Sequence, residues 1–114
     1  MLKTQLIKRD NNKYQNNPAH VNVEIKTLVN KAISNNIKTV LVKVLENGEI
    51  KPHSHDTLEI FHILEGTGIV LINGDYQKFE CGDTIYAPAG VIHGLKNTEK
   101  TPVVLLANFP NYKS

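Results

Sequence analysis

Three histidines and one glutamate are the side chains of this sequence best suited to chemistry. His53, His55 and Glu59 lie in one short stretch, and His93 follows later in the chain. Side chains alternate between the faces of a strand, so His53 and His55 project to the same side, and Glu59 joins them if no bulge intervenes. Imidazole and carboxylate ligands suit Fe, Mn, Ni, Zn or Cu, whereas calcium or magnesium prefers mostly oxygen. The pattern therefore indicates a site for a divalent transition metal.

A second stretch, from Gly82 to Asn97, supplies the fourth candidate ligand. Gly82 at one end and Pro88 with Gly90 at the other signal turns around a short strand, and His93 begins the next strand. A neighbouring strand would thus bring His93 to the same site. Four protein ligands on an octahedral ion leave two positions for a bidentate substrate, or for a substrate and O₂.

The elements that must position these ligands are short strands. Apolar runs rich in Val, Ile, Thr, Phe and Tyr recur between turn signals, a spacing typical of an all-β sandwich or barrel with little helix. Asn73 and Gly74 favour a hairpin turn, and Asn47 and Gly48 signal a further turn. Residues 28–33 fit a helical stripe and a strand end about equally well. The predicted strands cover residues 21–29, 37–45, 57–64, 68–73, 76–79, 83–87, 91–97 and 102–108.

Both stretches resemble the two signature motifs of the cupin superfamily. The second motif matches in full, because the spacing runs Gly82, five residues, Pro88, one residue, Gly90, two residues, His93, three residues, Asn97. This resemblance implies an antiparallel double-stranded β-helix, or jelly-roll barrel, in which a metal ion is held by three histidines and a glutamate.

The first motif is met at His53, His55, Glu59 and Gly66. Four residues separate Gly48 from His53, where the family pattern has five, and this difference lies in the turn before the ligands. The two motifs together assign His53, His55, Glu59 and His93 as the metal ligands.

The resemblance also implies a range of activities. Small cupins include sugar-acid isomerases, ring-opening enzymes, dioxygenases and decarboxylases, as well as members without a settled activity. A metal acting as a Lewis acid would polarise a carbonyl or hydroxyl of a small oxygen-rich substrate and favour isomerisation or ring opening of a sugar or sugar acid. Fe(II) would instead activate O₂. A module that binds a metal or small ligand without turnover is the non-enzymatic alternative.

Thr57, Phe61 and Tyr86 are candidates to line the pocket, because they lie on or near the ligand strands. Phe61 fits a place in the core equally well, and parity across a turn does not fix the direction of Tyr86. Glu59 is a poor free base if it binds the metal, so Tyr86 is the remaining candidate proton carrier.

The other chemically active side chains have structural interpretations. His62 has the opposite strand parity to Glu59 and should face away from the site. His20, in the polar N-terminal region, is interpreted as a surface or satisfied polar residue. Asn97 is expected to form hydrogen bonds within the barrel, and Cys81 to be a small buried residue beside a turn.

Length and composition favour one folded domain. The chain has 114 residues, 40% hydrophobic and 21% charged, which is too apolar for a disordered protein. Residues 1–20 are expected to form a short N-terminal strand and a mobile polar loop, and residues 21–114 a single barrel. No run approaches the ~18 apolar residues that would span a bilayer, and no signal peptide is evident, so we expect a cytoplasmic protein without a membrane partner.

Charge and patterning bear on partners. Thirteen basic and eleven acidic side chains leave a net charge of +2, the lysines are scattered and tryptophan is absent, which argues against nucleic acid. A single cysteine excludes an internal disulfide. Several strands are apolar on both faces, so either a second subunit or an N-terminal segment should cover the outer face. A small-molecule substrate and a homodimer are the partners we expect.

Overall fold

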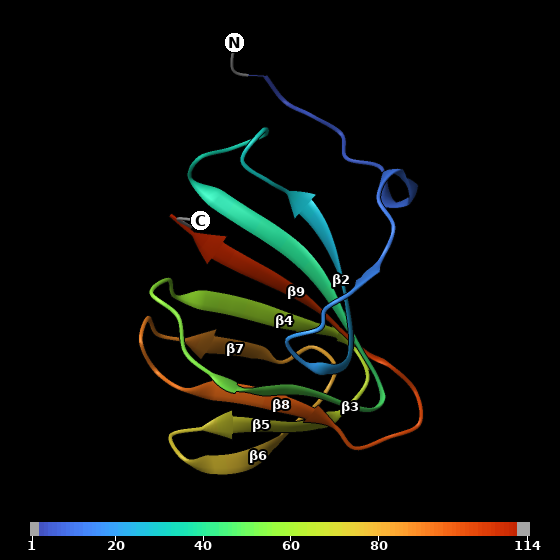
Figure 1. Ribbon diagram of the computed structural model, residues 1–114, viewed down its shortest axis with the longest axis vertical. Coiled ribbons are helices and arrows are strands. Elements are labelled where there is room, and N and C mark those ends of the chain that lie inside the picture. The colour runs from blue at the N-terminus through green and yellow to red at the C-terminus, as the bar shows by residue number, and fades with distance from the viewer. Residues whose placement is uncertain (1–2, 112–114) are drawn as a thin grey trace.

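The computed structural model describes residues 3–111 and is built from antiparallel strands (Figure 1). Among these residues there is no α-helix, and the helical structure is a single turn of 3-10 helix. The elements are η1 (Arg9–Asn11), β1 (Gln15–Asn16), β2 (Val21–Val29), β3 (Ile37–His53), β4 (Glu59–Glu65), β5 (Gly68–Ile72), β6 (Asp75–Phe79), β7 (Thr84–Ala87), β8 (His93–Asn97) and β9 (Val103–Pro110).

The long strand β3 joins the two halves of the molecule. Its first part pairs with β2 on one side and β9 on the other, and its last residues pair with β8. From β9 the sheet continues to β4 and β7, and from β8 it continues to β5 and β6. Because one strand belongs to both halves, the sheet curls and its inner faces enclose a common core. The predicted all-β jelly-roll fold is confirmed.

The core consists of the inward residues of these strands. Burial alternates along β9, as it should in an antiparallel sheet with one face on the core. Both halves contribute fully buried side chains, so neither half could bury its apolar face without the other. The largest of them are Phe79, Ile63, Leu95, Leu105, Val23, Val44, Val70 and Val103.

The turn predicted at Asn47 and Gly48 is wrong, because β3 continues through both residues to His53. Asn47 has a positive φ of 62°, so the strand bends there instead of reversing. Gly48 is needed for the same bend: a Cβ atom at this position would lie 2.6 Å from the Leu45 carbonyl oxygen and 2.7 Å from a methyl group of Val44. A two-residue turn signal therefore marks a bent strand here. The ambiguous segment 28–33 begins as the end of β2 and continues as a turn.

The N-terminal segment packs against the outer face of β2 and β3. Residues 3–8 are not in a strand, and β1, which pairs with β2, lies within the expected polar loop. The Tyr14 ring receives the ammonium groups of Lys26 at 4.6 Å and Lys43 at 4.2 Å from its centroid. Lys26 also donates a hydrogen bond to the Arg9 carbonyl at 3.0 Å. These contacts explain why Lys26, on the outer face, is only 8% exposed.

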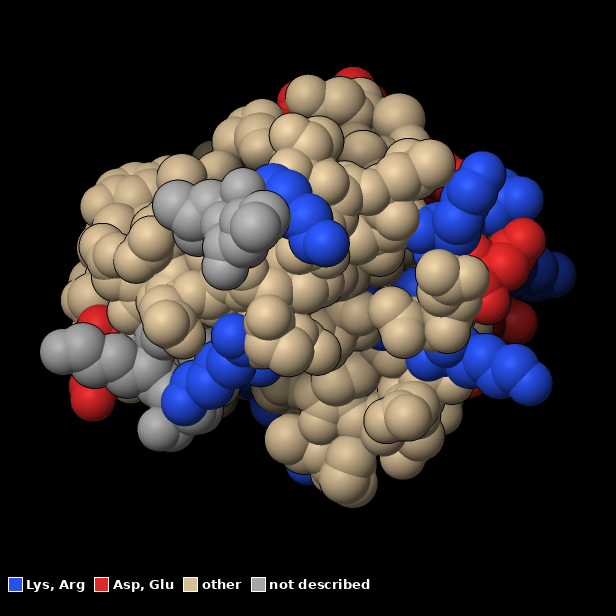
Figure 2. Space-filling model, turned by 90° about the horizontal axis from the view of Figure 1, so that it is seen from above, with Lys and Arg blue, Asp and Glu red and all other residues tan. Residues whose placement is uncertain are grey.

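The surface carries mixed charge. On the face shown in Figure 2, lysine and arginine side chains lie singly or beside acidic ones, without forming a continuous basic field. Within residues 3–111, no helix has the length and apolar character that crossing a membrane requires.

Candidate metal centre

The three histidines and the glutamate meet where the two halves of the sheet face each other. His53 is the last residue of β3, Glu59 the first of β4 and His93 the first of β8, while His55 lies in the loop between β3 and β4. His53 and His93 are direct partners in the ladder that joins β3 to β8. One potential ligand nitrogen from each histidine lies within 4.8 Å of the others.

Each of the three histidines is held by the same kind of bond. The Nδ1 atom lies close to a backbone carbonyl two residues away in sequence, and because a carbonyl oxygen only accepts, Nδ1 must carry the hydrogen. The Nε2 atom of the neutral ring is then left with its lone pair, the form that binds a metal. The distances are 2.7 Å from His53 to Lys51, 2.6 Å from His55 to Thr57 and 3.1 Å from His93 to Val91.

Glu59 brings negative charge to two of the three histidines, His55 and His93. Its Oε1 atom lies 3.2 Å from Nε2 of His55 and 3.2 Å from Nε2 of His93, and the residue is only 9% exposed. A carboxylate facing two nitrogen lone pairs is repelled unless a cation lies between them. Either a proton or a metal ion can supply that positive charge, and the nitrogen and oxygen donors fit a divalent transition metal.

The histidines differ in proton affinity. Burial favours the neutral form of His93, but its hydrogen bonds to Glu59 and Val91 outweigh burial and raise its pKa above the ordinary value. The pKa of His53 is lowered, mainly by burial and further by the neighbouring His93 and His55. Of these two histidines, His93 therefore holds a proton more readily than His53, and a metal ion that binds His93 must displace that proton.

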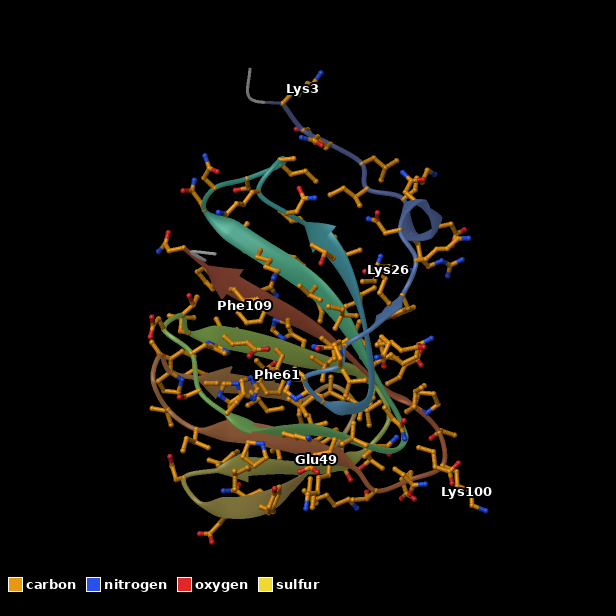
Figure 3. The ribbon with its side chains drawn as sticks, in the orientation of Figure 1. Lys3, Lys26, Glu49, Phe61, Lys100 and Phe109 are labelled. Atoms are coloured by element: carbon orange, nitrogen blue, oxygen red, sulfur yellow. The ribbon has the colours of Figure 1, made fainter. Side chains whose placement is uncertain are left out.

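The four side chains form part of the wall of a cavity of about 500 Å³. The His55 ring lies 5.6 Å from the Phe109 ring, and the His93 ring lies 6.4 Å from the Phe61 ring. Figure 3 labels both phenylalanines, Phe61 on β4 and Phe109 near the end of β9. The rest of the wall is largely aliphatic and comes from both halves, through Val23, Ile25, Val40, Val42, Ile50, Leu95 and Leu105.

Comparison with known proteins assigns this arrangement to a family. A family model described as "Cupin domain" matches residues 40–109, which include all four side chains of the candidate metal centre. The chain belongs to the cupin family. The resemblance read from the two motifs is thereby confirmed.

Individual cupins and related sequences extend this result. The uncharacterized protein MJ1618 of Methanocaldococcus jannaschii is 36% identical over 62 residues, covering 53% of this chain and 50% of the relative, so the aligned part spans about half of that relative. The polyketide cyclase RemF of Streptomyces resistomycificus has a TM-score of 0.85 at 19% identity, covering 96% and 81% of the two chains. A predicted oxalate decarboxylase of Thermotoga maritima has a TM-score of 0.81 at 21% identity, covering 93% and 98%. At these identities the structural likeness shows the fold alone.

The candidate ligands come together in a different way from the one predicted by the alternation of side chains along a strand. Parity along a single strand was expected to place His53, His55 and Glu59 on one face. The structure instead ends β3 at His53 and begins β4 at Glu59, with a loop over residues 54–58. The bend of that loop, held by the hydrogen bond from His55 to Thr57, turns His55 back toward the other ligands.

Two of the three predicted pocket residues lie at the cavity. Thr57 and Phe61 both line it, and Phe61 is also part of the buried core. Tyr86 does not reach it, and this expectation is corrected. In β7 the buried residues are Ile85 and Ala87, so the alternating Tyr86 points outward and is 60% exposed, beside its cross-strand partner Ile60.

The remaining side chains have structural roles. His62 is exposed and its Nδ1 atom lies 2.9 Å from the Thr84 hydroxyl, away from the centre as its parity predicted. The buried Asn97 amide acts within the barrel, also as predicted. Cys81 is exposed, contrary to expectation, because it lies in the turn after β6, where its thiol donates to the Leu64 carbonyl at 3.1 Å. Asn97 Nδ2 donates to the carbonyl oxygens of Val44, Leu45 and Thr101.

Sequence reasoning missed His20. This residue is half-buried and lines the cavity, and its ring centroid lies 5.1 Å from that of His53. Its Nδ1 atom accepts a hydrogen bond from the Lys51 amide at 3.0 Å. The only signal was indirect: His20 immediately precedes β2, and the pairing of Val21 with Glu49 brings the start of β2 alongside the ligand end of β3.

Proposed function

We propose that this cupin is an enzyme that uses a divalent transition metal, held by His53, His55, His93 and Glu59, as a Lewis acid on a small oxygen-bearing substrate. The carrying observation is the common tautomer of the three histidines. Three Nδ1 bonds to backbone carbonyls leave three Nε2 lone pairs, and two of these atoms, on His55 and His93, lie 3.2 Å from the buried carboxylate of Glu59. Hydrogen bonds that fix the tautomer and the ring orientation of histidine are typical of metal-binding sites.

When bound, the metal would polarise a carbonyl or hydroxyl oxygen of the substrate. The protein's own contribution is to hold the ligands, exclude water and orient the substrate. Glu59 serves as a ligand and is therefore not available as a free base. The aliphatic wall of the cavity removes bulk water from the reacting oxygen, which strengthens every electrostatic interaction there.

Isomerisation or ring opening of a sugar, a sugar acid or a related oxygen-rich molecule is the reaction class that we propose. The walls formed by Val40, Val42, Leu105 and Phe61 favour a substrate with one apolar face over one with hydroxyl groups on every side. RemF, which has a similar fold, is described as a polyketide cyclase, so an enzyme with this fold acts on a small organic substrate.

An Fe(II)-dependent dioxygenase is the second candidate. The observation that favours it is the same apolar wall beside the metal centre, because O₂ enters such a cavity without loss of hydrogen bonds. Oxygen uptake by Fe(II)-loaded protein in the presence of small keto acids and sugar acids would support this candidate. Turnover of those compounds with Zn²⁺, Mn²⁺ or Ni²⁺, without oxygen uptake, would support the Lewis-acid enzyme. Metal binding without turnover of any compound would favour a binding module.

Elemental analysis of protein purified without an affinity tag tests the metal centre directly. We expect close to one transition-metal ion per chain, and loss of that ion in the variant His55→Asn. The matched control is His62→Asn, which removes an exposed histidine on the opposite face of β4. Full metal content in His55→Asn, or none in the wild-type protein after incubation with each candidate metal, would overturn the proposal.

The homodimer and the cytoplasmic location are also proposals. The N-terminal segment covers the outer face near β2, but Leu64 and Tyr86 on the outer face of β4 and β7 are 47% and 60% exposed. We propose that a second copy contacts these residues. Light scattering would give twice the monomer mass for the wild-type protein and a smaller mass for Leu64→Lys.

A further inference from the structure

His20 lies at the rim of the cavity, at the end of the turn formed by residues 17–20. This turn lies outside residues 40–109, the part of the chain that matches the cupin family model. It is ordered by local bonds: the Asn17 side chain accepts from the Ala19 amide at 3.1 Å, and the His20 amide donates to the Asn17 carbonyl at 3.3 Å. Asn17 and His20 both line the cavity. Figure 1 shows this turn between β1 and β2, in front of the sheet.

The tautomer of His20 is opposite to that of the three candidate ligands. Its Nδ1 atom faces a backbone N–H, which only donates, so Nδ1 must hold the lone pair. In the neutral ring the hydrogen is then on Nε2. His53, 5.1 Å away between ring centroids, faces a carbonyl with Nδ1 and therefore keeps its lone pair on Nε2. Two neighbouring rings of the same residue type thus present a donor and an acceptor.

His20 is therefore unsuited to be a fourth histidine ligand and well suited to bind an oxygen atom. Among the described residues, its Nε2 atom has no hydrogen-bond partner within the chain, although the ring lines the cavity. A donor in a partly apolar site gains from an acceptor, and an oxygen with negative charge is the best one.

We propose that His20 is a substrate-binding residue that donates its Nε2–H to an oxygen of a small hydroxy or keto acid held at the metal centre. This inference rests on the proposed function, because it requires a metal that binds the substrate. A metal held by the four protein ligands would accept oxygen atoms of such an acid. The Nε2–H donor of His20 would favour a charged oxygen, and the aliphatic wall of the cavity would accommodate the carbon chain. The substrate class is thereby narrowed from oxygen-rich molecules in general to short acids with a neighbouring oxygen.

Two variants separate the donor role of His20 from a structural one. In His20→Asn the side-chain oxygen can take the place of Nδ1 and keep the bond from Lys51, but the distal donor is lost. In His20→Gln the amide nitrogen can replace the distal donor, but the bond from Lys51 is lost. The probes are Co²⁺ and lactate. The visible spectrum of Co²⁺ reports metal binding, and its change on titration with lactate reports binding of the acid.

We expect His20→Asn to bind Co²⁺ like the wild-type protein but lactate roughly 3- to 10-fold more weakly, as for the loss of one hydrogen bond. His20→Gln should retain most of the affinity for lactate. The reverse ranking of the two variants, or equal affinity for lactate in all three proteins, would overturn the role of His20 and leave the metal centre intact. A wild-type protein that fails to bind Co²⁺ would overturn both proposals.

Discussion

Two regions of the cavity contain histidine, and the hydrogen of the neutral ring lies on a different nitrogen in each region. On the wall formed by β3, β4 and β8, His53, His55 and His93 give their Nδ1 hydrogens to carbonyl groups and direct lone pairs inward. At the rim before β2, Nδ1 of His20 accepts a hydrogen bond from the Lys51 amide, so the hydrogen of the neutral ring is on Nε2. The difference teaches that the backbone group facing Nδ1, more than the residue type, determines what a histidine can bind.

Removal of a wall ligand should have the largest effect. We expect His55→Asn to weaken Co²⁺ binding by at least about 100-fold, beyond the 10- to 100-fold that loss of an outer-sphere partner costs. Titration followed by the Co²⁺ spectrum measures this. His62→Asn is the control and should bind like the wild-type protein. An unchanged Co²⁺ affinity in His55→Asn would show that His55 is not a metal ligand, and would contradict the proposed difference between the three clustered histidines and His20.

A change of pH should have the next largest effect, because a metal ion competes with the proton on His93. Its pKa is raised above the ordinary 6.5, so Co²⁺ affinity should fall as the pH drops through that raised pKa, by up to about tenfold per pH unit. In the metal-free protein the sign is reversed: the protonated His93 paired with Glu59 stabilises the fold below pH 6.5, and this contribution is lost as the pH rises through the raised pKa.

Thermal unfolding with and without Co²⁺ at about pH 5.5 and about pH 8, on either side of the reference pKa of histidine, checks both signs. The increase in Tm caused by Co²⁺ should be larger at the higher pH. In Glu59→Gln the pKa of His93 should fall toward its ordinary value, which an NMR titration of the imidazole protons would detect. An equal increase in Tm at both pH values would argue against histidine ligands.

Loss of the hydrogen bond that orders the turn before β2 should have a smaller effect, which lowers stability and acid binding but not metal binding. Asn17→Ala removes the acceptor for the Ala19 amide and should cost about 0.5–1 kcal/mol of stability, the lower part of the range for a hydrogen bond because the site is exposed. Lactate binding should weaken with it, while Co²⁺ affinity stays unchanged. A matching loss of Co²⁺ affinity would mean that the rim also supports the wall.

The smallest effect is expected at Tyr86. Because its side chain points outward from β7, Tyr86→Phe should leave both Co²⁺ and lactate affinities within about 0.5 kcal/mol of the wild-type values, as for an ordinary surface substitution. Isothermal titration calorimetry would measure both. A large loss of lactate binding would show that Tyr86 reaches the cavity of its own or a second subunit.

The four residues of the candidate metal centre could be predicted from the sequence, whereas the position of His20 at the rim of the cavity could not. The all-β class follows from the spacing of strands and turn signals, whereas the jelly-roll fold and the set of four candidate ligands were implied by the resemblance of the two motifs to those of cupins. The reason for their convergence was only partly foreseen: His55 reaches the centre through the loop at residues 54–58 and not through strand parity. His20 carries no such spacing, since its position depends on the pairing of β2 with β3 and on a turn at Asn17. The prediction for Tyr86 was wrong because strand parity cannot be carried across the turn before β7, so the sequence did not fix the direction of this side chain.

The bend of β3 at Asn47 and Gly48 has a consequence for how such a cavity can change over evolution. Residues before the bend, such as Val40 and Val42, line the aliphatic part of the cavity, and His53 after the bend belongs to the candidate metal centre. The bend at Asn47 and Gly48 therefore lies between two surfaces of one cavity. Exchange of those two residues would alter the depth available to a guest molecule while leaving every ligand identity in place.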